Sequence, residues 1–409
     1  LHLNYNHQVI SMSTVTLQGD LATDFSYTGH ITKAAGAQLQ VPIPSRYVEM
    51  GEEERLAAIR DAREKLGSKL VILGHHYQRA DVIEWADFRG DSFKLCKDAS
   101  ARPEAEYIIF CGVHFMAEAA DILSAPHQKV ILPDLHAGCS MADMADIDQV
   151  EEAWEALAEV CPGQTIIPIT YMNSSANLKA FVGRNGGAVC TSSNAKKVME
   201  WALRPKDDGG AGGQKLLFFP DQHLGRNTAV LEMDFSLDDC AVWNPALDLG
   251  GQTEEKLQAS PILLWQGHCS VHGTFMPIHI ENLRKQYPGI KIIVHPECTY
   301  EVVSIADDHG STQKIRKYVE EAPAGATIAI GTEINLVKRL ELEYPDKTIL
   351  SVNPNVCVCS TMYRVDGPHL LWVMENLLNG KVVNQIVVPE QIGIEAKLAL
   401  QRMLDISAQ

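Results

Sequence analysis

The feature that most constrains this chain is a pair of sequence intervals that occurs twice. His75 lies 17 residues before Ser92, and Ser92 lies 47 residues before Cys139. The same intervals of 17 and 47 residues separate three residues nearer the C-terminus: His295, Thr312 and Cys359. Two matched intervals in succession, each joining residues of the same chemical kind, indicate internal repetition. We therefore expect similar structural units to recur along the chain.

A third copy with longer intervals lies between these two. Tyr171 precedes Ser192 by 21 residues, and Ser192 precedes Cys269 by 77 residues. The excess falls in a Gly-rich turn near 207–213 and in an irregular stretch near 234–260, and we predict that both are loops. The predicted organisation is a polar extension followed by three units: residues 1–45, then 46–140, 141–268 with the insertion at about 234–260, and 269–409 with the C-terminal helices.

Short apolar runs alternate with helical periodicity in all three units. In the first unit an amphipathic pattern over 52–66 precedes an apolar run at 69–73, which leads into His75 and Tyr77. Strands separated by helices of this length form parallel sheets that helices cover on both faces. The predicted fold class is α/β, with three pseudo-symmetric three-layer αβα domains whose parallel sheets surround a central site.

Each unit places one Cys-Ser pair after an apolar strand, at Cys139, Cys269 and Cys359. Ligands of such sheets bind beyond the carboxyl ends of the strands, so three units around a pseudo-threefold axis would direct these thiols to a shared centre. Three thiolates suit a three-cysteine metal or iron–sulfur site, and they would leave one iron of a four-iron cluster open to substrate. Cys357 remains an alternative to Cys359, which the 47-residue interval favours.

Polar side chains at the other predicted strand ends would surround these thiols. Ser92, Ser192 and Thr312 lie at predicted helix starts, where a hydroxyl group and the positive end of the helix dipole favour carboxylates or phosphate. Groups that can accept or donate protons accompany them: His75, Tyr77, Tyr171, His272, His295 and Glu297. The pattern predicts a polyanionic small molecule that undergoes metal-assisted proton transfer and elimination.

Composition argues against several classes of partner. The net charge of −17 disfavours nucleic acid and anionic membrane surfaces, since either would require a basic face. We find no apolar run of the roughly 20 residues that a membrane span needs. Ten cysteines in 409 residues are too sparse for a disulfide scaffold, so we expect a reducing, cytoplasmic location.

From about Gly51 to Leu404 the chain resembles the quinolinate synthase family, the iron–sulfur enzymes of NAD biosynthesis. The resemblance rests on short segments that occur in the family's order: Gly74-His75-His76-Tyr77-Gln78, Gly90-Asp91-Ser92, Cys139-Ser140-Met141-Ala142-Asp143-Met144, Thr170-Tyr171-Met172-Asn173, Cys190-Thr191-Ser192-Ser193-Asn194, Pro220-Asp221 with Leu224-Gly225, Trp265-Gln266-Gly267-His268-Cys269 with His272, His295-Pro296-Glu297-Cys298, and Gly310-Ser311-Thr312. So many ordered matches make coincidence improbable.

The resemblance implies condensation of iminosuccinate (iminoaspartate) with dihydroxyacetone phosphate to quinolinate, phosphate and water, with the open iron of a [4Fe-4S] cluster as Lewis acid. It implies that Cys139, Cys269 and Cys359 ligate the cluster, and that an aspartate oxidase or dehydrogenase supplies the iminosuccinate. The implied substrate-binding residues are His75, Ser92, Tyr171, Met172, Asn173, Ser192, His295, Pro296, Glu297 and Thr312. For proton transfer we select Glu297 first, together with Tyr77, His75, His272 and His295.

Two other functions fit the same residues. A different iron–sulfur hydro-lyase could use the open iron, and a three-cysteine metal sensor or binding protein could recognise a ligand without turnover. The ring of tyrosine, histidine, glutamate and hydroxyl groups favours an enzyme, because a protein that only holds a metal does not need groups that move protons.

Overall fold

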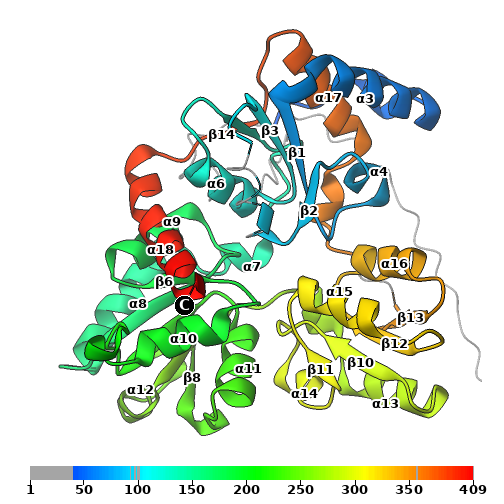
Figure 1. Ribbon diagram of the computed structural model, residues 1–409. Coiled ribbons are helices and arrows are strands. Elements are labelled where there is room, and N and C mark those ends of the chain that lie inside the picture. Colours follow the sequence, from blue (N-terminus) through cyan, green and yellow to red (C-terminus); the bar gives the residue numbers. More distant parts are fainter. Residues whose placement is uncertain (1–39, 93, 96–97, 99–101, 356–357, 409) are drawn as a thin grey trace, which may run out of the picture.

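Three α/β units lie around a common centre (Figure 1), with the first in blue to cyan, the second in green and the third in yellow. The computed structural model describes residues 40–92, 94–95, 98, 102–355 and 358–408. The predicted extension falls outside these residues except for 40–45, and Cys357 falls outside them as well.

The sheets of the three units share one strand order. In sequence order, the four repeated strands of each unit are β1 (Leu70–His75), β2 (Phe88–Gly90), β3 (Tyr107–Cys111) and β4 (Lys129–Ile131); β5 (Ile166–Tyr171), β6 (Ala188–Cys190), β7 (Lys215–Phe219) and β9 (Ile262–Trp265); and β10 (Lys291–Val294), β11 (Asp308–His309), β12 (Thr327–Gly331) and β13 (Thr348–Ser351). Across each sheet the order is second, first, third, fourth, and every one of these neighbouring pairs is parallel. The predicted α/β class and the threefold repetition are therefore confirmed.

Helices cover both faces of the sheets, which explains why the central strands are mostly apolar and buried. All six residues of β1 are buried, as are all five of β7. Within the described residues, no helix combines the length and apolar character that crossing a membrane requires. The helices are α2 (Ser45–Glu49), α3 (Glu52–Leu66), α4 (Ala80–Ile83), α6 (His114–Leu123), α7 (Ser140–Asp143), α8 (Ile147–Val160), α9 (Ala176–Arg184), α10 (Ala195–Leu203), α11 (Gln222–Glu232), α12 (Glu254–Ala259), α13 (Pro277–Gln286), α14 (Tyr300–Val303), α15 (Thr312–Glu321), α16 (Ile334–Glu343), α17 (Gly367–Leu378) and α18 (Glu390–Ala408).

The repetition extends to single hydrogen bonds. In the first unit the Asp87 carboxylate accepts from the backbone N–H of Ile72 at 2.8 Å, and in the third unit Asp307 accepts from Ile292 at 2.9 Å. An arginine from the helix before the first strand of the unit pairs with each carboxylate, Arg63 on α3 with Asp87 and Arg284 on α13 with Asp307. Such agreement in detail indicates that the units are copies of one structural plan.

The stretch at about 234–260 is not the loop that the sequence suggested. It contains β8 (Cys240–Trp243), which pairs in parallel with β9 and extends the second sheet, as well as the short helix α12. The four-residue run Cys-Ala-Val-Trp is too short to show a period of its own. Its pairing with β9 supplies the backbone partners that make it a strand.

The C-terminal segment, which the sequence analysis grouped with the third unit, packs on the other two. Strand β14 (Gln385–Ile386) pairs antiparallel with β4 of the first sheet, and α17 packs against α3. Helix α18, red in Figure 1, lies along α9 of the second unit. The two helices approach closely at Gly183, where a Cβ atom would lie 2.0 Å from the Glu395 carbonyl oxygen.

Candidate active site

The strand order determines where a ligand can bind. Between the first and third strands of each sheet the chain leaves in opposite directions, which opens a crevice beyond the carboxyl ends of these strands. The crevices of the three units meet in one cavity with an empty volume of about 730 Å³. Its lining includes these residues singled out from the sequence: His75, Tyr77, Ser92, Cys139, Tyr171, Met172, Asn173, Ser192, Cys269, His272, His295, Glu297, Thr312 and Cys359. Pro296 is not part of the lining.

The three cysteines of the cavity share one backbone setting. The carbonyl oxygen of each accepts a hydrogen bond from the N–H four residues later, at distances of 3.1 Å for Cys139, 2.9 Å for Cys269 and 2.9 Å for Cys359. A second backbone N–H, three residues after each cysteine, interacts with its sulfur. Each sulfur therefore lies at the start of a helical turn, where N–H groups favour the thiolate.

Without a cation, ionisation of the three thiols is unfavourable here. Burial raises the pKa of the Cys139, Cys269 and Cys359 thiols, and the negative charges that would form on neighbouring sulfurs raise the pKa of Cys139 and Cys269 further. A bound metal or cluster would remove this penalty, because thiolate ligands bind in the deprotonated form. The donor set of three soft sulfurs fits iron in a cluster.

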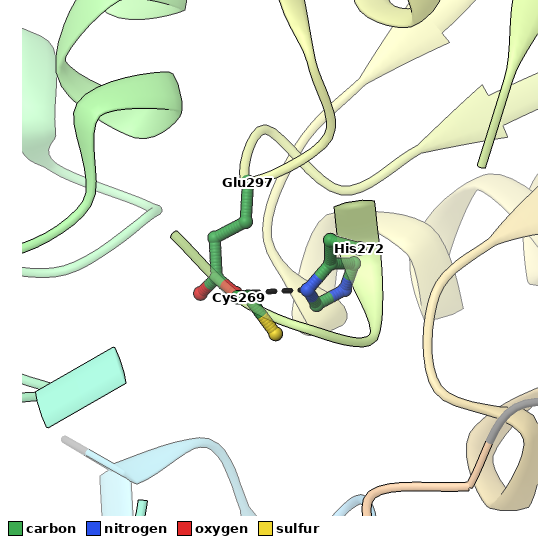
Figure 2. A group of neighbouring side chains, drawn as sticks. All are labelled: Cys269, His272 and Glu297. Atoms are coloured by element: carbon green, nitrogen blue, oxygen red, sulfur yellow. Dashed lines mark ion pairs between the residues drawn. The ribbon is translucent and has the colours of Figure 1, made fainter. Parts of the chain in front are cut away.

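Glu297 lies beside two histidines at one side of the cavity. Its side chain follows β10, and its Oε2 lies 2.8 Å from His272 Nδ1, the contact that Figure 2 shows. Its Oε1 lies 3.8 Å from His295 Nδ1, and the Tyr171 hydroxyl also hydrogen bonds to the carboxylate. Burial alone would raise the pKa of Glu297, but His272 and His295 together lower it. Glu297 is therefore ionised and in contact with groups that can exchange protons with it.

A second chain of polar contacts joins the first and third units. The Tyr77 hydroxyl and Thr332 Oγ1 lie 2.7 Å apart, and Thr332 Oγ1 lies 3.2 Å from His272 Nε2. Burial raises the pKa of Tyr77 well above its ordinary value, so its hydroxyl remains protonated at neutral pH. The sequence analysis did not select Thr332. Its position directly after β12 could have identified it, because candidate residues already followed the two neighbouring strands of the same sheet.

Ser311 and Thr312 have different roles at the start of α15. Ser311 caps the helix by accepting from the Lys314 N–H at 3.3 Å. Thr312 Oγ1 is buried and has no hydrogen-bond partner in the described part of the chain. The Thr312 hydroxyl is thus left free for a ligand atom in the cavity that it lines.

Glu333 is another lining residue that the sequence analysis passed over. It is fully buried after β12, and its Oε1 lies 3.4 Å from the backbone nitrogen of Cys359, which donates to it. Burial raises the pKa of Glu333 to about 7. The contact connects the end of the third strand to the loop that carries the third cysteine.

Comparison with known proteins identifies the kind of protein to which this cavity belongs. Residues 57–405 match the family described as quinolinate synthetase A protein. A quinolinate synthase of a Nocardioides species is 58% identical over 345 residues, which cover 84% of this chain and 87% of that protein. The quinolinate synthase of Streptomyces coelicolor is 52% identical over 89% of this chain and 91% of its own length, and that of Herpetosiphon aurantiacus is 55% identical over 88% and 95%. The chain therefore belongs to the quinolinate synthetase A family.

Proposed function

We propose that this protein is a quinolinate synthase of NAD biosynthesis, a transferase that condenses iminosuccinate with dihydroxyacetone phosphate and releases quinolinate, phosphate and water. The observation that carries the proposal is the meeting of Cys139, Cys269 and Cys359, one from each repeat, in a cavity that also contains a free buried hydroxyl and an ionised glutamate. Family membership and the names of the relatives support it.

The hydroxyl groups at the second strand ends would hold the anionic parts of the substrates. Thr312 has its Oγ1 unoccupied, and Ser192 lies at the matching place between β6 and α10. Ser92 lies at the same place after β2. N–H groups and hydroxyls at helix starts bind carboxylates and phosphate without any need for a basic protein surface.

We propose that Cys139, Cys269 and Cys359 hold a [4Fe-4S] cluster. When bound, the cluster would supply Lewis-acid chemistry through an iron that no protein sulfur ligates. The three thiols are all free, and all three line the cavity.

The remaining groups of the cavity would bind substrate and carry protons. Glu297 would accept a proton and pass it along its contact with His272, while the Tyr77 hydroxyl would donate one. Burial lowers the pKa of His75 and of His295 to about 3, so both rings are neutral at physiological pH. A neutral imidazole can donate to a substrate oxygen with one nitrogen and accept with the other.

The reaction needs a partner reaction that makes its unstable substrate. We propose that an aspartate oxidase or an aspartate dehydrogenase supplies iminosuccinate, and that both enzymes act in the cytoplasm.

Anaerobic assay of the reconstituted protein for quinolinate tests the proposal. The wild type should bind iron and sulfide, absorb broadly near 400 nm, and form quinolinate from the two substrates. Cys269→Ala should lose cluster and activity together, whereas Cys240→Ala, which removes a buried thiol on β8 away from the cavity, should keep both. A colourless wild type, or an active Cys269→Ala variant, would contradict the assignment.

One observation favours a different metal. Ligand atoms of Cys269, His272 and Glu297 lie within 4.8 Å of one another, a set that could bind a single zinc ion. In that case Cys139→Ala and Cys359→Ala would retain one metal per chain, and the protein would be colourless. Under the cluster proposal both substitutions should abolish the absorption near 400 nm.

A further inference from the structure

The loops after the first strands carry Tyr77, Asn173 and Glu297, and a helix of another unit contacts each loop or the helix start that follows it. These helices are α6, α11 and α16, which follow the third strand of the first, second and third unit respectively. The hydrogen bonds described below each join two different units, so each depends on how two units dock.

Asn227 on α11 of the second unit holds the Glu297 loop of the third unit. The Asn227 side chain is fully buried. Its Nδ2 donates to the carbonyl oxygens of Pro296 at 2.9 Å and of Cys298 at 2.8 Å. One carbonyl belongs to the peptide directly before Glu297 and the other to the peptide after Cys298, so one amide group holds the loop before and after this residue.

Arg339 on α16 of the third unit makes the equivalent contact with the Tyr77 loop of the first unit. Its Nη2 donates to the His76 carbonyl oxygen at 2.6 Å. His76 and Pro296 occupy the same place, between a strand-end histidine and the residue with the acid/base group. Arg339 and Asn227 also match, since each lies six residues after the N-cap residue of its helix.

A third contact joins the first unit to the second, so that each unit contacts the next around the cavity. Glu118 on α6 of the first unit accepts a hydrogen bond from the Ala176 N–H of the second unit at 2.9 Å. Ala176 begins α9, directly after the loop that follows Tyr171, the last residue of β5, and carries Asn173. Here the helix side chain accepts the hydrogen bond, whereas Asn227 and Arg339 donate theirs. The order of the units is the same in all three contacts: a helix of one unit holds a segment of the next unit.

We propose that Asn227 and Arg339 are positioning residues, which hold the loops of Glu297 and Tyr77 from a neighbouring unit and thereby set the geometry of proton transfer. His272, the partner of Glu297, lies on a different segment, after β9. A shift of the Glu297 loop therefore changes the distance between the two groups. The kinetic part of this inference rests on the proposed function, whereas the loop contacts do not.

Four variants test the inference in the anaerobically reconstituted protein. Asn227→Ala removes the contact with the Glu297 loop. Arg339→Met removes the bond to the His76 carbonyl, while Asn335 of the same helix keeps its bond to the Tyr77 carbonyl. Arg339→Lys keeps a donor near His76. The control is Asn376→Ala, which removes an amide that donates to the Trp372 carbonyl within α17. The measurements are kcat, KM, iron content, and hydrogen exchange of peptides that contain Gln78 or Cys298.

The two exchange probes are well defined, because Gln78 N–H donates to the His75 carbonyl oxygen and Cys298 N–H to that of His295, each at 3.0 Å. Asn227→Ala should accelerate exchange around Cys298, and Arg339→Met around Gln78. The value of kcat should fall between about 10-fold and 100-fold, since a displacement of about 1 Å can cost about 100-fold. KM should change less, because the hydroxyls that bind substrate lie on other loops. Arg339→Lys should recover most of the lost kcat.

Unchanged exchange in both loops would overturn the inference, as would a kcat within about twofold of the control, or a loss of activity that only follows a loss of iron. If the wild type itself made no quinolinate, the proposed function would fail. The exchange measurement would still decide whether the two residues hold the loops.

Discussion

Replacement of Glu297 by glutamine tests the proposed proton transfer most directly. Glutamine keeps the shape of the side chain and one acceptor oxygen for the Tyr171 hydroxyl, but it cannot take up a proton at neutral pH. The amide group would also meet His272 Nδ1, which now lies 2.8 Å from a carboxylate oxygen. The change therefore removes acid/base chemistry with little change in packing at a residue that is 3% exposed.

The expected loss follows from the role. A positioned acid/base group contributes about 10² to 10⁴ in rate, which corresponds to about 3 to 5 kcal/mol of transition-state stabilisation. We expect kcat for quinolinate formation to fall at least about 100-fold. The iron content should stay at the wild-type value, because the three thiols are untouched.

Anaerobic single-turnover and steady-state assays with matched iron content measure this effect. The control is Glu320→Gln, which removes one negative charge from an exposed position on α15. Activity of Glu297→Gln within about threefold of this control would refute the acid/base role. Loss of iron from Glu297→Gln would instead make the carboxylate a metal ligand.

Three further predictions test the third cysteine, the docking of α18 and the effect of pH on stability. Cys359→Ser should lose the absorption near 400 nm, and Cys357→Ser should keep it; the reverse result would exchange the two thiols as cluster ligand. Gly183→Ala should destabilise the protein by about 1 to 3 kcal/mol, since the new methyl group would meet the Glu395 carbonyl oxygen. Faster proteolysis within α18 would report that loss, and unchanged cleavage would contradict it. Burial raises the pKa of Asp121 to about 6, above the unfolded value of about 3.9, so ionisation costs stability as the pH rises from about 4 to about 6. Asp121→Asn should therefore raise the free energy of unfolding by up to about 3 kcal/mol above pH 6 and change it little at pH 4. Thermal unfolding of both proteins at the two pH values measures this difference.

The matched intervals in the sequence were informative because they reflect how many residues separate the ends of successive strands in each unit. The 17 residues from His75 to Ser92 connect the ends of the first and second strands, and the next 47 residues lead past the fourth strand to Cys139. Equal intervals in the third unit reproduce the same sheet. A strand order that places these ends together then gathers residues distant in sequence into one cavity, so most candidate positions could be predicted before the structure.

Contacts between units could not be predicted in this way. Tyr77 and Thr332 are 255 residues apart, and neither a local period nor a repeat interval connects them. Asn227 shows the same limit, because its helix pattern indicates only a buried polar residue and its partners lie in another unit. Strand β8 was predicted as a loop for a related reason. The two C-terminal helices were predicted correctly, but their packing against α3 and α9 could not be predicted, since tertiary packing determines these partners.

The threefold backbone produces a site without threefold chemistry. At the place after the first strand, the units carry the sequences His75-His76-Tyr77, Tyr171-Met172-Asn173 and His295-Pro296-Glu297. The repeats thus supply equivalent positions for the three cysteines, while the last residue of this segment carries a phenol in the first unit, an amide in the second and a carboxylate in the third. A substrate in the cavity would therefore meet a different side chain from each unit: Tyr77, Asn173 and Glu297. Because Glu297 and Tyr77 lie on loops that helices of other units hold, the orientation of these two side chains in the cavity depends on how the three units dock.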